Sequence, residues 1–269
     1  MFYFQLSIRV TNYIRNYFQA IEEWTTSYDD TNIKSYPNVT THLRKLTMSA
    51  ASTHLDRFEN TLTRAGKSGL VGDMNILRDN GFNAFDMVPL LRRPGDNNQL
   101  VTGADYISYL CQGSPKLRFI LEQISSYILP KEVDGRYNKL LLTEDIPLTA
   151  FFFELVLNLT YVETAVLHSA LTDEERVNLI KRFNNEDDPL RILIIMYSVS
   201  AAGANLDPAC CRVIVVTPAI NSAIESQAYS RVIRVCTTSN KCSPSIWYKG
   251  NCLDIYRFRR RRMSIYSDC

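Results

Sequence analysis

The 269-residue sequence lacks an uncharged apolar run of the roughly 20 residues that a membrane-spanning helix requires. It has no CxxC pair, and its seven cysteines are odd in number, so neither a zinc ribbon nor a secreted disulfide framework is indicated. The three histidines are scattered and form no evident metal set or catalytic triad. We therefore expect an intracellular protein in a reducing compartment, with no membrane partner and no metal site.

A phosphate-binding loop is also missing from the sequence. Gly66-Lys67-Ser68 has the ending of GxxxxGK[ST], but Thr61 occupies the position of the first glycine and no apolar strand precedes it. No DExH or DExx box occurs in a suitable setting. Without a cradle of backbone amides, a lysine and a metal, the chain alone is expected to bind ATP weakly and hydrolyse it negligibly.

The sequence has no strong charge imbalance, because it contains 30 basic and 28 acidic residues. Positive charge nevertheless gathers near the C-terminus, where the stretch from Lys249 to Arg262 holds six basic residues and the single acid Asp254. Within it, Arg259, Arg260 and Arg261 fit contacts with nucleic-acid phosphates. A solvated helix end or a localisation signal explains the same pattern equally well.

Apolar periodicity divides the chain into four parts. Residues 1–66 have the spacing of helices separated by Pro37 and form a helical, connector-like segment. Residues 67–113 are expected to be an irregular linker, since six of the ten glycines lie between Gly66 and Gly103. Residues 114–262 form the main domain, and residues 263–269 are a tail.

The main domain alternates short apolar runs with helical ones. Continuous apolar strands are typical of a sheet that is covered on both faces, and alternating units predict an α/β fold with a parallel sheet flanked by helices. A capping box, Thr172 with Glu175, marks the start of one helix. The predicted strands span residues 139–143, 162–167, 191–196 and 212–216, and the predicted helices span residues 148–159 and 173–184.

Two segments that follow predicted strands contain candidate binding residues. Ligands of parallel sheets bind at the carboxyl ends of the strands, where both segments begin. The first, Ser198 to Leu206, is rich in small residues that allow close backbone approach, although an ordinary strand-to-helix loop has the same composition. The second, Thr217 to Arg234, contains the candidate arginines.

Gln227, Arg231 and Arg234 share one face of a predicted helix, so their side chains can converge on one small anion such as a nucleotide triphosphate. Guanidinium groups are always charged and bind phosphate oxygens through two donors at once. The alternative is a solvated helix face on which the arginines pair with Glu225.

The order of these segments resembles motifs V and VI in the C-terminal, second RecA-like lobe of superfamily-two helicases, most closely the Swi/Snf-type chromatin-remodelling ATPases. Upstream segments are similar to the same lobe, so the resemblance covers about residues 100 to 262, and the preceding helices resemble the connector between the two lobes. These upstream matches are Ser114-Pro115-Lys116-Leu117, Lys139 to Glu144, His168 to Leu171, Arg176 and Phe183.

The resemblance implies a RecA-like fold and a role for each candidate residue. Arg231 and Arg234 would be catalytic arginine fingers that reach the γ-phosphate of ATP, and Gln227, Gly203 and Asn205 would lie at the nucleotide. Ser200 and Leu206 would lie near double-stranded DNA, together with the basic residues Arg259 to Arg261. A nuclear location is implied as well. The paired glycines of the family's motif V are replaced here by Ser200 and Ala201.

Two functional hypotheses follow. In the first, the chain is the second lobe of a Swi/Snf-like DNA-dependent ATPase or translocase, and ATP and Mg²⁺ bind only when a first lobe is supplied by a longer protein or by another chain. In the second, the chain is a degenerate, non-catalytic module that binds DNA or protein. The missing phosphate loop makes it uncertain whether the chain is an enzyme, and the isolated chain is expected to hold no cofactor.

Overall fold

A computed structural model describes residues 15, 19, 37–55, 78, 80–92, 99–130, 138–200, 206, 210–219, 223–228 and 245–248. Their centre is a five-stranded parallel sheet in the order β2-β3-β1-β4-β5. The strands are β1 (Lys139–Glu144), β2 (Glu163–Leu167), β3 (Leu190–Met196), β4 (Cys210–Val215) and β5 (Ser245–Tyr248).

The strands β1 and β3 form the middle of the sheet. Leu141 of β1 pairs with Leu193 of β3 and with Val213 of β4, so apolar residues run across the sheet in register. Every residue of β1 is buried, as are all but one of β3. Continuous apolar strands therefore occur where both faces are covered, as the sequence predicts.

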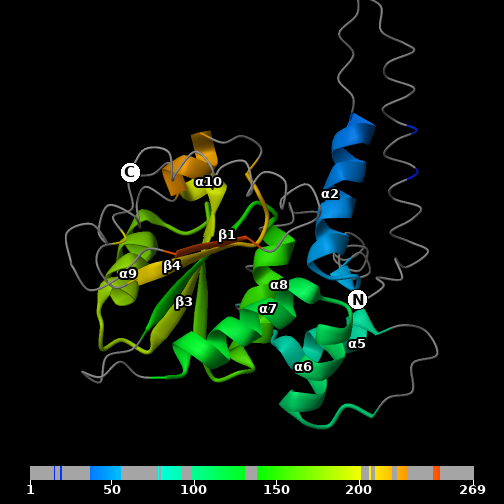
Figure 1. Ribbon diagram of the computed structural model, residues 1–269, viewed down its shortest axis with the longest axis horizontal. Coiled ribbons are helices and arrows are strands. Elements are labelled where there is room, and N and C mark those ends of the chain that lie inside the picture. Colours follow the sequence, from blue (N-terminus) through cyan, green and yellow to red (C-terminus); the bar gives the residue numbers. More distant parts are fainter. Residues whose placement is uncertain are drawn as a thin grey trace, which may run out of the picture.

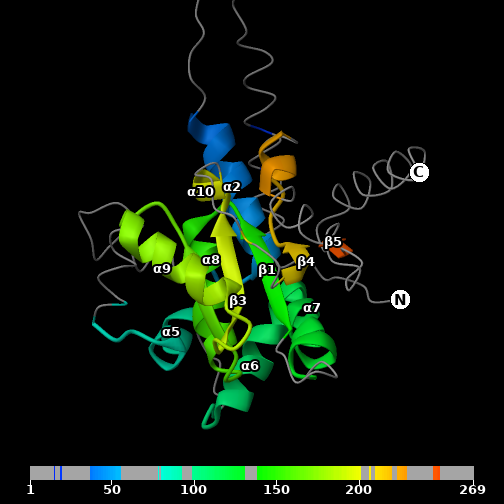
Figure 2. The ribbon, with the colours of Figure 1, turned by 90° about the vertical axis from the view of Figure 1, so that its left-hand side faces the viewer.

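Helices cover the two faces of the sheet. The helix α8 (Pro147–Asn158) follows β1, and α9 (Asp173–Asn184) follows β2. Figure 1 shows α9 on one side of the strands and α8 with α7 (Pro115–Gln123) on the other. Figure 2, turned by 90°, separates α9 and α7 in the same way.

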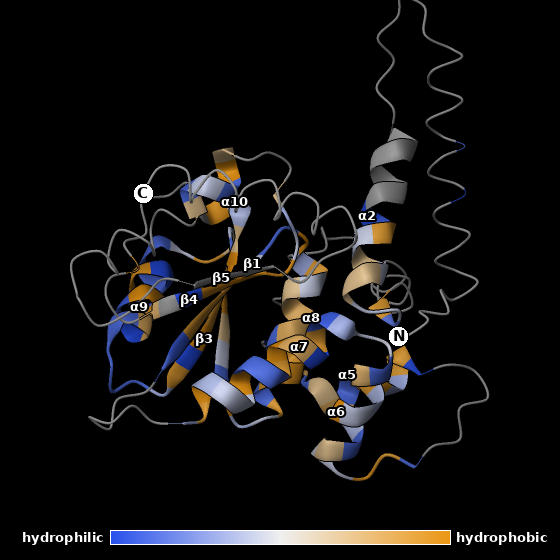
Figure 3. Cartoon of the chain, viewed as in Figure 1, coloured by the Kyte–Doolittle hydropathy of each residue, from blue (hydrophilic) through white to orange (hydrophobic). Residues whose placement is uncertain are grey.

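The sequence explains why the two helices lie at different depths. Eight of the twelve residues of α8 are buried, including Phe151, Phe152 and Phe153. In α9 only Phe183 is buried, and hydrophilic residues cover its outer face (Figure 3). The capping box predicted for α9 is present, because Thr172 accepts a hydrogen bond from the Glu175 amide and Glu175 accepts one from the Thr172 amide.

In the described part of the chain, three helices precede α7. They are α2 (Pro37–Ala51), α5 (Ala84–Leu91) and α6 (Gly103–Gln112), and they lie on the α7 side of the domain, away from α9 (Figure 1). A π-helical turn, η1 (Ile124–Ile128), continues α7, and the short α10 (Tyr197–Ser200) follows β3. None of the described helices is long and apolar enough to cross a membrane.

The expectation of an irregular linker at residues 67–113 is wrong for α5 and α6. Each helix has its own capping box, made by Asn83 with Asp86 and by Thr102 with Asp105. Their apolar faces enter the main core, where Met87 and Leu110 are both fully buried. Tertiary burial and good caps therefore outweigh the glycine content of this stretch.

Gly113 joins the end of α2 to the beginning of α7. Its carbonyl accepts a hydrogen bond of 2.9 Å from the Thr53 amide, and the neighbouring Ser114 hydroxyl donates to the Ala51 carbonyl. A Cβ atom at position 113 would lie 2.4 Å from Nε2 of His54 and 2.6 Å from Oγ1 of Thr53. The close backbone approach at this junction consequently requires glycine.

The fold class predicted from the sequence is confirmed as an α/β parallel sheet flanked by helices and preceded by a helical segment. The boundaries of the four predicted parts stay predictions. Of the predicted helical segment at residues 1–66 the structure describes residues 15, 19 and 37–55, and the tail at residues 263–269 lies outside the described residues.

Candidate functional site at the carboxyl edge of the sheet

Buried polar side chains meet where β1, β3 and β4 end. Tyr197, the first residue after β3, places its hydroxyl 2.9 Å from Oγ1 of Thr143 and 3.0 Å from the Thr217 carbonyl oxygen. Because the carbonyl can only accept, the phenol donates to Thr217 and accepts from Thr143. The ends of the three strands are therefore tied together by one side chain.

Glu144, the last residue of β1, extends this group. Its carboxylate accepts hydrogen bonds from the amides of Asp145 and Ile146, at 2.9 and 3.0 Å, and from the Thr217 hydroxyl at 3.0 Å. The side chain is fully buried, and this burial raises its pKa, while the nearby Lys116 ammonium opposes the rise. Lys116 itself donates to the Val216 carbonyl. We call Lys116, Thr143, Glu144, Tyr197 and Thr217 the strand-end cluster.

The helix at residues 223–228 follows the strand-end cluster in the chain. Its Glu225 is 3% exposed and accepts a hydrogen bond of 3.2 Å from the Ala219 amide, which holds the loop after β4 against the helix. The sequence offers Glu225 as a partner of the arginines; the structure shows its buried contact with the loop, and Arg231 and Arg234 lie outside the described residues. Gln227, two residues further along the helix, is exposed.

A second group of charged residues lies beside β2. Arg78 donates two hydrogen bonds to Oε2 of Glu154, from Nε at 2.9 Å and from Nη2 at 2.5 Å, and its guanidinium lies 4.9 Å from the centre of the Phe151 ring. The other carboxylate oxygen accepts from the Val166 amide at 3.2 Å. Burial raises the pKa of Glu154, and Arg78 opposes this rise.

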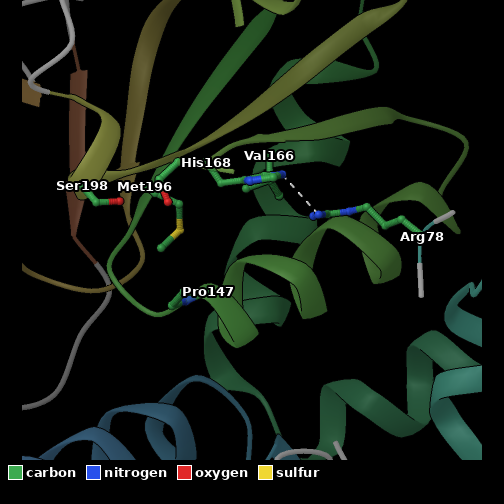
Figure 4. A pocket seen from close by; sticks show the side chains of 7 residues that line it. Arg78, Pro147, Val166, His168, Met196 and Ser198 are labelled. Atoms are coloured by element: carbon green, nitrogen blue, oxygen red, sulfur yellow. Dashed lines mark hydrogen bonds between the residues drawn. The ribbon is translucent and has the colours of Figure 1, made fainter. Parts of the chain in front are cut away.

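His168 completes this second group and lines a small pocket. Its Nε2 lies 3.3 Å from Nη1 of Arg78 (Figure 4). A guanidinium only donates, so Nε2 accepts and the proton of the neutral ring is on Nδ1, which has no hydrogen-bond partner among the described residues. Burial, together with the charges of Arg78 and Arg176, lowers the pKa of His168 to about 4. The pocket is lined by Arg78, Pro147, Val166, His168, Ser169, Met196 and Ser198.

The predicted site residues are only partly covered by the structure. Arg231, Arg234, Gly203 and Asn205 lie outside the described residues, as do Arg259, Arg260 and Arg261. Ser200 is the last residue of α10. Leu206 is 1% exposed and packs in the main core, so a contact of this residue with nucleic acid would have to involve its backbone.

Sequence reasoning missed most of the strand-end cluster. Lys116 and Glu144 were noted as parts of similar segments, but their contacts join residues 100 and 73 positions apart in the chain. A polar residue at the end of an apolar run is the local signal that marks Glu144 and Tyr197. In the described part of the chain, no group of three or more His, Cys, Asp and Glu residues could hold a metal ion.

The comparisons with known proteins address the same region. Residues 136–236 match the model of the helicase conserved C-terminal domain family. The chain contains a helicase C-terminal domain. This domain begins just before β1 and includes the strand-end cluster from Thr143 onward, Gln227 and both predicted arginine fingers. No curated protein sequence matches the chain significantly.

Solved structures share the fold of the helicase C-terminal domain. The C-terminal part of the Fun30 ATPase domain is similar with a TM-score of 0.53 and 17% identity, over 91% of this chain and 81% of that one. The Sulfolobus solfataricus SWI2/SNF2 ATPase core, solved in complex with dsDNA, is similar with a TM-score of 0.50 and 14% identity, over 90% of this chain. The chain spans 38% of the length of the Sulfolobus protein.

These findings confirm the predicted resemblance to a Swi/Snf-type C-terminal lobe at the level of domain and fold. Because the similarity extends over 91% of the chain in the Fun30 comparison, it includes the helices that precede residue 136 as well as the helicase C-terminal domain. The roles of individual residues stay predictions.

Proposed function

We propose that this chain is the second lobe of a Swi/Snf-like, DNA-dependent ATPase or translocase, and that it supplies Arg231 and Arg234 to ATP and Mg²⁺ held by a first lobe. One observation carries the proposal. The helix at residues 223–228 is the first described helix after β4, its Gln227 is exposed, and it lies inside the region that matches the helicase C-terminal domain.

The chemistry of this arrangement suits phosphoryl transfer. Negative charge on the γ-phosphate spreads over its equatorial oxygens in the transition state, and a guanidinium stabilises that charge through two donors. Arg231 and Arg234 follow Gln227 at intervals of four and three residues, which are helical spacings. The helix with Gln227 is anchored through Glu225 and the strand-end cluster, so a rigid base precedes the arginines in the chain.

Double-stranded DNA is the proposed polymer partner. The Sulfolobus SWI2/SNF2 core was solved with dsDNA, and its fold is shared by this chain. The proposed contacts are the segment around Ser200 and the basic residues Arg259, Arg260 and Arg261, which would bind phosphates without regard to sequence. A nuclear location is proposed with this partner.

Reconstitution tests the catalytic proposal. The chain would be mixed with the first lobe of a Swi/Snf-type ATPase, and ATP hydrolysis would be measured with and without duplex DNA. We expect DNA-stimulated hydrolysis for the mixture, negligible hydrolysis for the chain alone, and loss of activity in Arg231→Ala. Arg118→Ala is the matched control, because Arg118 is exposed on α7 and has no proposed role. A mixture that stays inactive would contradict the catalytic proposal.

DNA binding is measured separately on the chain alone. We expect affinity for duplex DNA at low salt that falls as salt increases, because each phosphate contact releases counterions. Replacing Arg259, Arg260 and Arg261 by glutamine should reduce this salt dependence, whereas Arg118→Gln should not. Binding that persists in a chain unable to restore hydrolysis would favour the non-catalytic module, and the absence of binding at low salt would count against both functions.

A further inference from the structure

Tyr197 connects two parts of the helicase C-terminal domain that are separate in the sequence. It is the first residue of α10, whose last residue, Ser200, lies at DNA in the proposed function. Its side chain points to the other part, because the hydroxyl donates to the Thr217 carbonyl oxygen at 3.0 Å. Thr217 begins the loop that leads to the helix at residues 223–228.

The ring of Tyr197 contacts that helix as well. It forms a small apolar cluster with Ala219 and Ala228, each 4% exposed like Tyr197 itself, and the partly buried Ile224 packs against them. This cluster is separate from the main core, so the inner face of the helix rests on Tyr197. Any displacement of α10 that moves the tyrosine ring must therefore move the helix or open a void beneath it.

The rest of the strand-end cluster gives Tyr197 a fixed reference. The Thr143 hydroxyl, at the end of the central strand β1, lies 2.9 Å from the phenol oxygen. Thr217 is held from its other side by Glu144 at 3.0 Å, and the Val216 amide donates to the Thr143 carbonyl at 3.0 Å. Because both hydrogen-bond partners of the phenol are held at the strand ends, a shift of Tyr197 must stretch or break these hydrogen bonds.

We propose that Tyr197 is a positioning residue that transmits contact with DNA at Ser198–Ser200 to the helix at residues 223–228, and so to Gln227. The inference rests on the proposed function, since it requires that α10 lie at the DNA. It adds to that function the side chain through which the DNA-facing segment and the nucleotide-facing helix are coupled.

Hydrogen exchange of the full chain, with and without duplex DNA at low salt, tests the coupling. In the wild type we expect DNA to slow amide exchange in residues 219–228 by roughly fivefold or more, the ratio that corresponds to a typical coupling between two sites. Tyr197→Phe keeps the ring but loses both hydrogen bonds. Its exchange in residues 219–228 should be roughly tenfold faster without DNA.

The decisive quantity is the ratio of exchange rates with and without DNA. In Tyr197→Phe this ratio should fall close to one, while the affinity for DNA stays within about twofold of wild type because no proposed DNA contact is removed. A residue that only stabilises the fold would raise the basal exchange and leave the ratio unchanged, and that result would overturn the proposal.

Two further variants guard the interpretation. Thr143→Val removes the hydroxyl that donates to the phenol while keeping its shape, and it should give an intermediate ratio. Tyr161→Phe is the matched control, because Tyr161 is 99% exposed and is not part of the strand-end cluster, so both exchange and ratio should equal wild type. If the wild-type chain binds DNA and amide exchange in residues 219–228 does not change, the coupling is refuted but the proposed function is not. If the chain does not bind DNA, both the proposed function and the coupling are refuted.

Discussion

Replacing Gly113 by alanine tests how the preceding helices are joined to the helicase C-terminal domain. The backbone of Gly113 has φ −97° and ψ −1°, which alanine adopts without strain, so only the added methyl group matters. That methyl group would lie 2.4 Å from Nε2 of His54 and 2.6 Å from Oγ1 of Thr53. His54 is 3% exposed and its ring centre lies 5.1 Å from that of Tyr109, so it has little room to move away.

The expected cost follows from these contacts. Overpacking of a well-packed site costs about 1 to 3 kcal/mol, and the loss of backbone freedom in the unfolded chain returns about 0.4 to 1 kcal/mol. We therefore expect Gly113→Ala to lower the free energy of unfolding by about 1 to 2 kcal/mol. If the methyl group displaces Thr53 and His54, the first contact to weaken should be the 2.9 Å hydrogen bond from the Thr53 amide to the Gly113 carbonyl.

Equilibrium unfolding in urea measures this change. Gly103→Ala is the matched control, because a Cβ atom there would have no neighbour within 4 Å, and this variant should be as stable as wild type or slightly more stable. The double variant His54→Ala with Gly113→Ala should show a smaller effect of the second substitution, since the clashing ring is gone. If Gly113→Ala were as stable as Gly103→Ala, the added methyl group would not overpack the junction with His54 and Thr53.

Two further predictions concern buried side chains. The folded pKa of His168, about 4, is below its ordinary value of 6.5, so its contribution to stability is complete above pH 6.5 and is lost as the pH falls towards 4. The free energy of unfolding, measured in urea, should fall between pH 7 and pH 4.5 in the wild type. In His168→Gln this fall should be smaller by up to about 3 kcal/mol, and an equal fall in both proteins would contradict the prediction. Lys139→Met removes an ammonium that donates to the carbonyls of Arg182 and Asn185 at the end of α9. It should therefore destabilise the fold by about 1 to 3 kcal/mol in the same assay. Lys181 is exposed, so Lys181→Met should change stability by less than about 0.5 kcal/mol.

Local signals in the sequence predicted the sheet and its flanking helices well. In a run such as Arg191 to Met196 almost every residue is apolar, so a strand made from it has two apolar faces. Such a strand is typical of a sheet that is covered on both faces, and the structure places this run in β3. The capping box at Thr172 fixed the start of α9 to the residue. The same kind of signal was present at Asn83 and at Thr102, where an aspartate at the third helical position replaces the more familiar glutamate.

Contacts between distant parts of the chain could not be predicted in this way. Periodicity indicates which face of an element is buried but not which element covers it, so the bond from Lys116 to Val216 and the pairing of Arg78 with Glu154 have no local signature. The position of Tyr197 beneath the helix at residues 223–228 depends on the packing of β1, β3 and β4 side by side. Helical spacing alone predicted that Gln227 lies on a helix, and the structure shows Gln227 exposed on the helix at residues 223–228.

Steady-state kinetics of the reconstituted ATPase test the proposed action of Arg231 on the γ-phosphate. Arg231→Ala should lower kcat by roughly a thousandfold or more, while KM for ATP and the affinity for DNA change little, because an arginine finger acts mainly in the transition state. Arg231→Lys should recover only a small part of the rate, since lysine cannot bind two phosphate oxygens through a fixed fork. A kcat for Arg231→Ala equal to that of wild type and of Arg118→Ala would contradict the account.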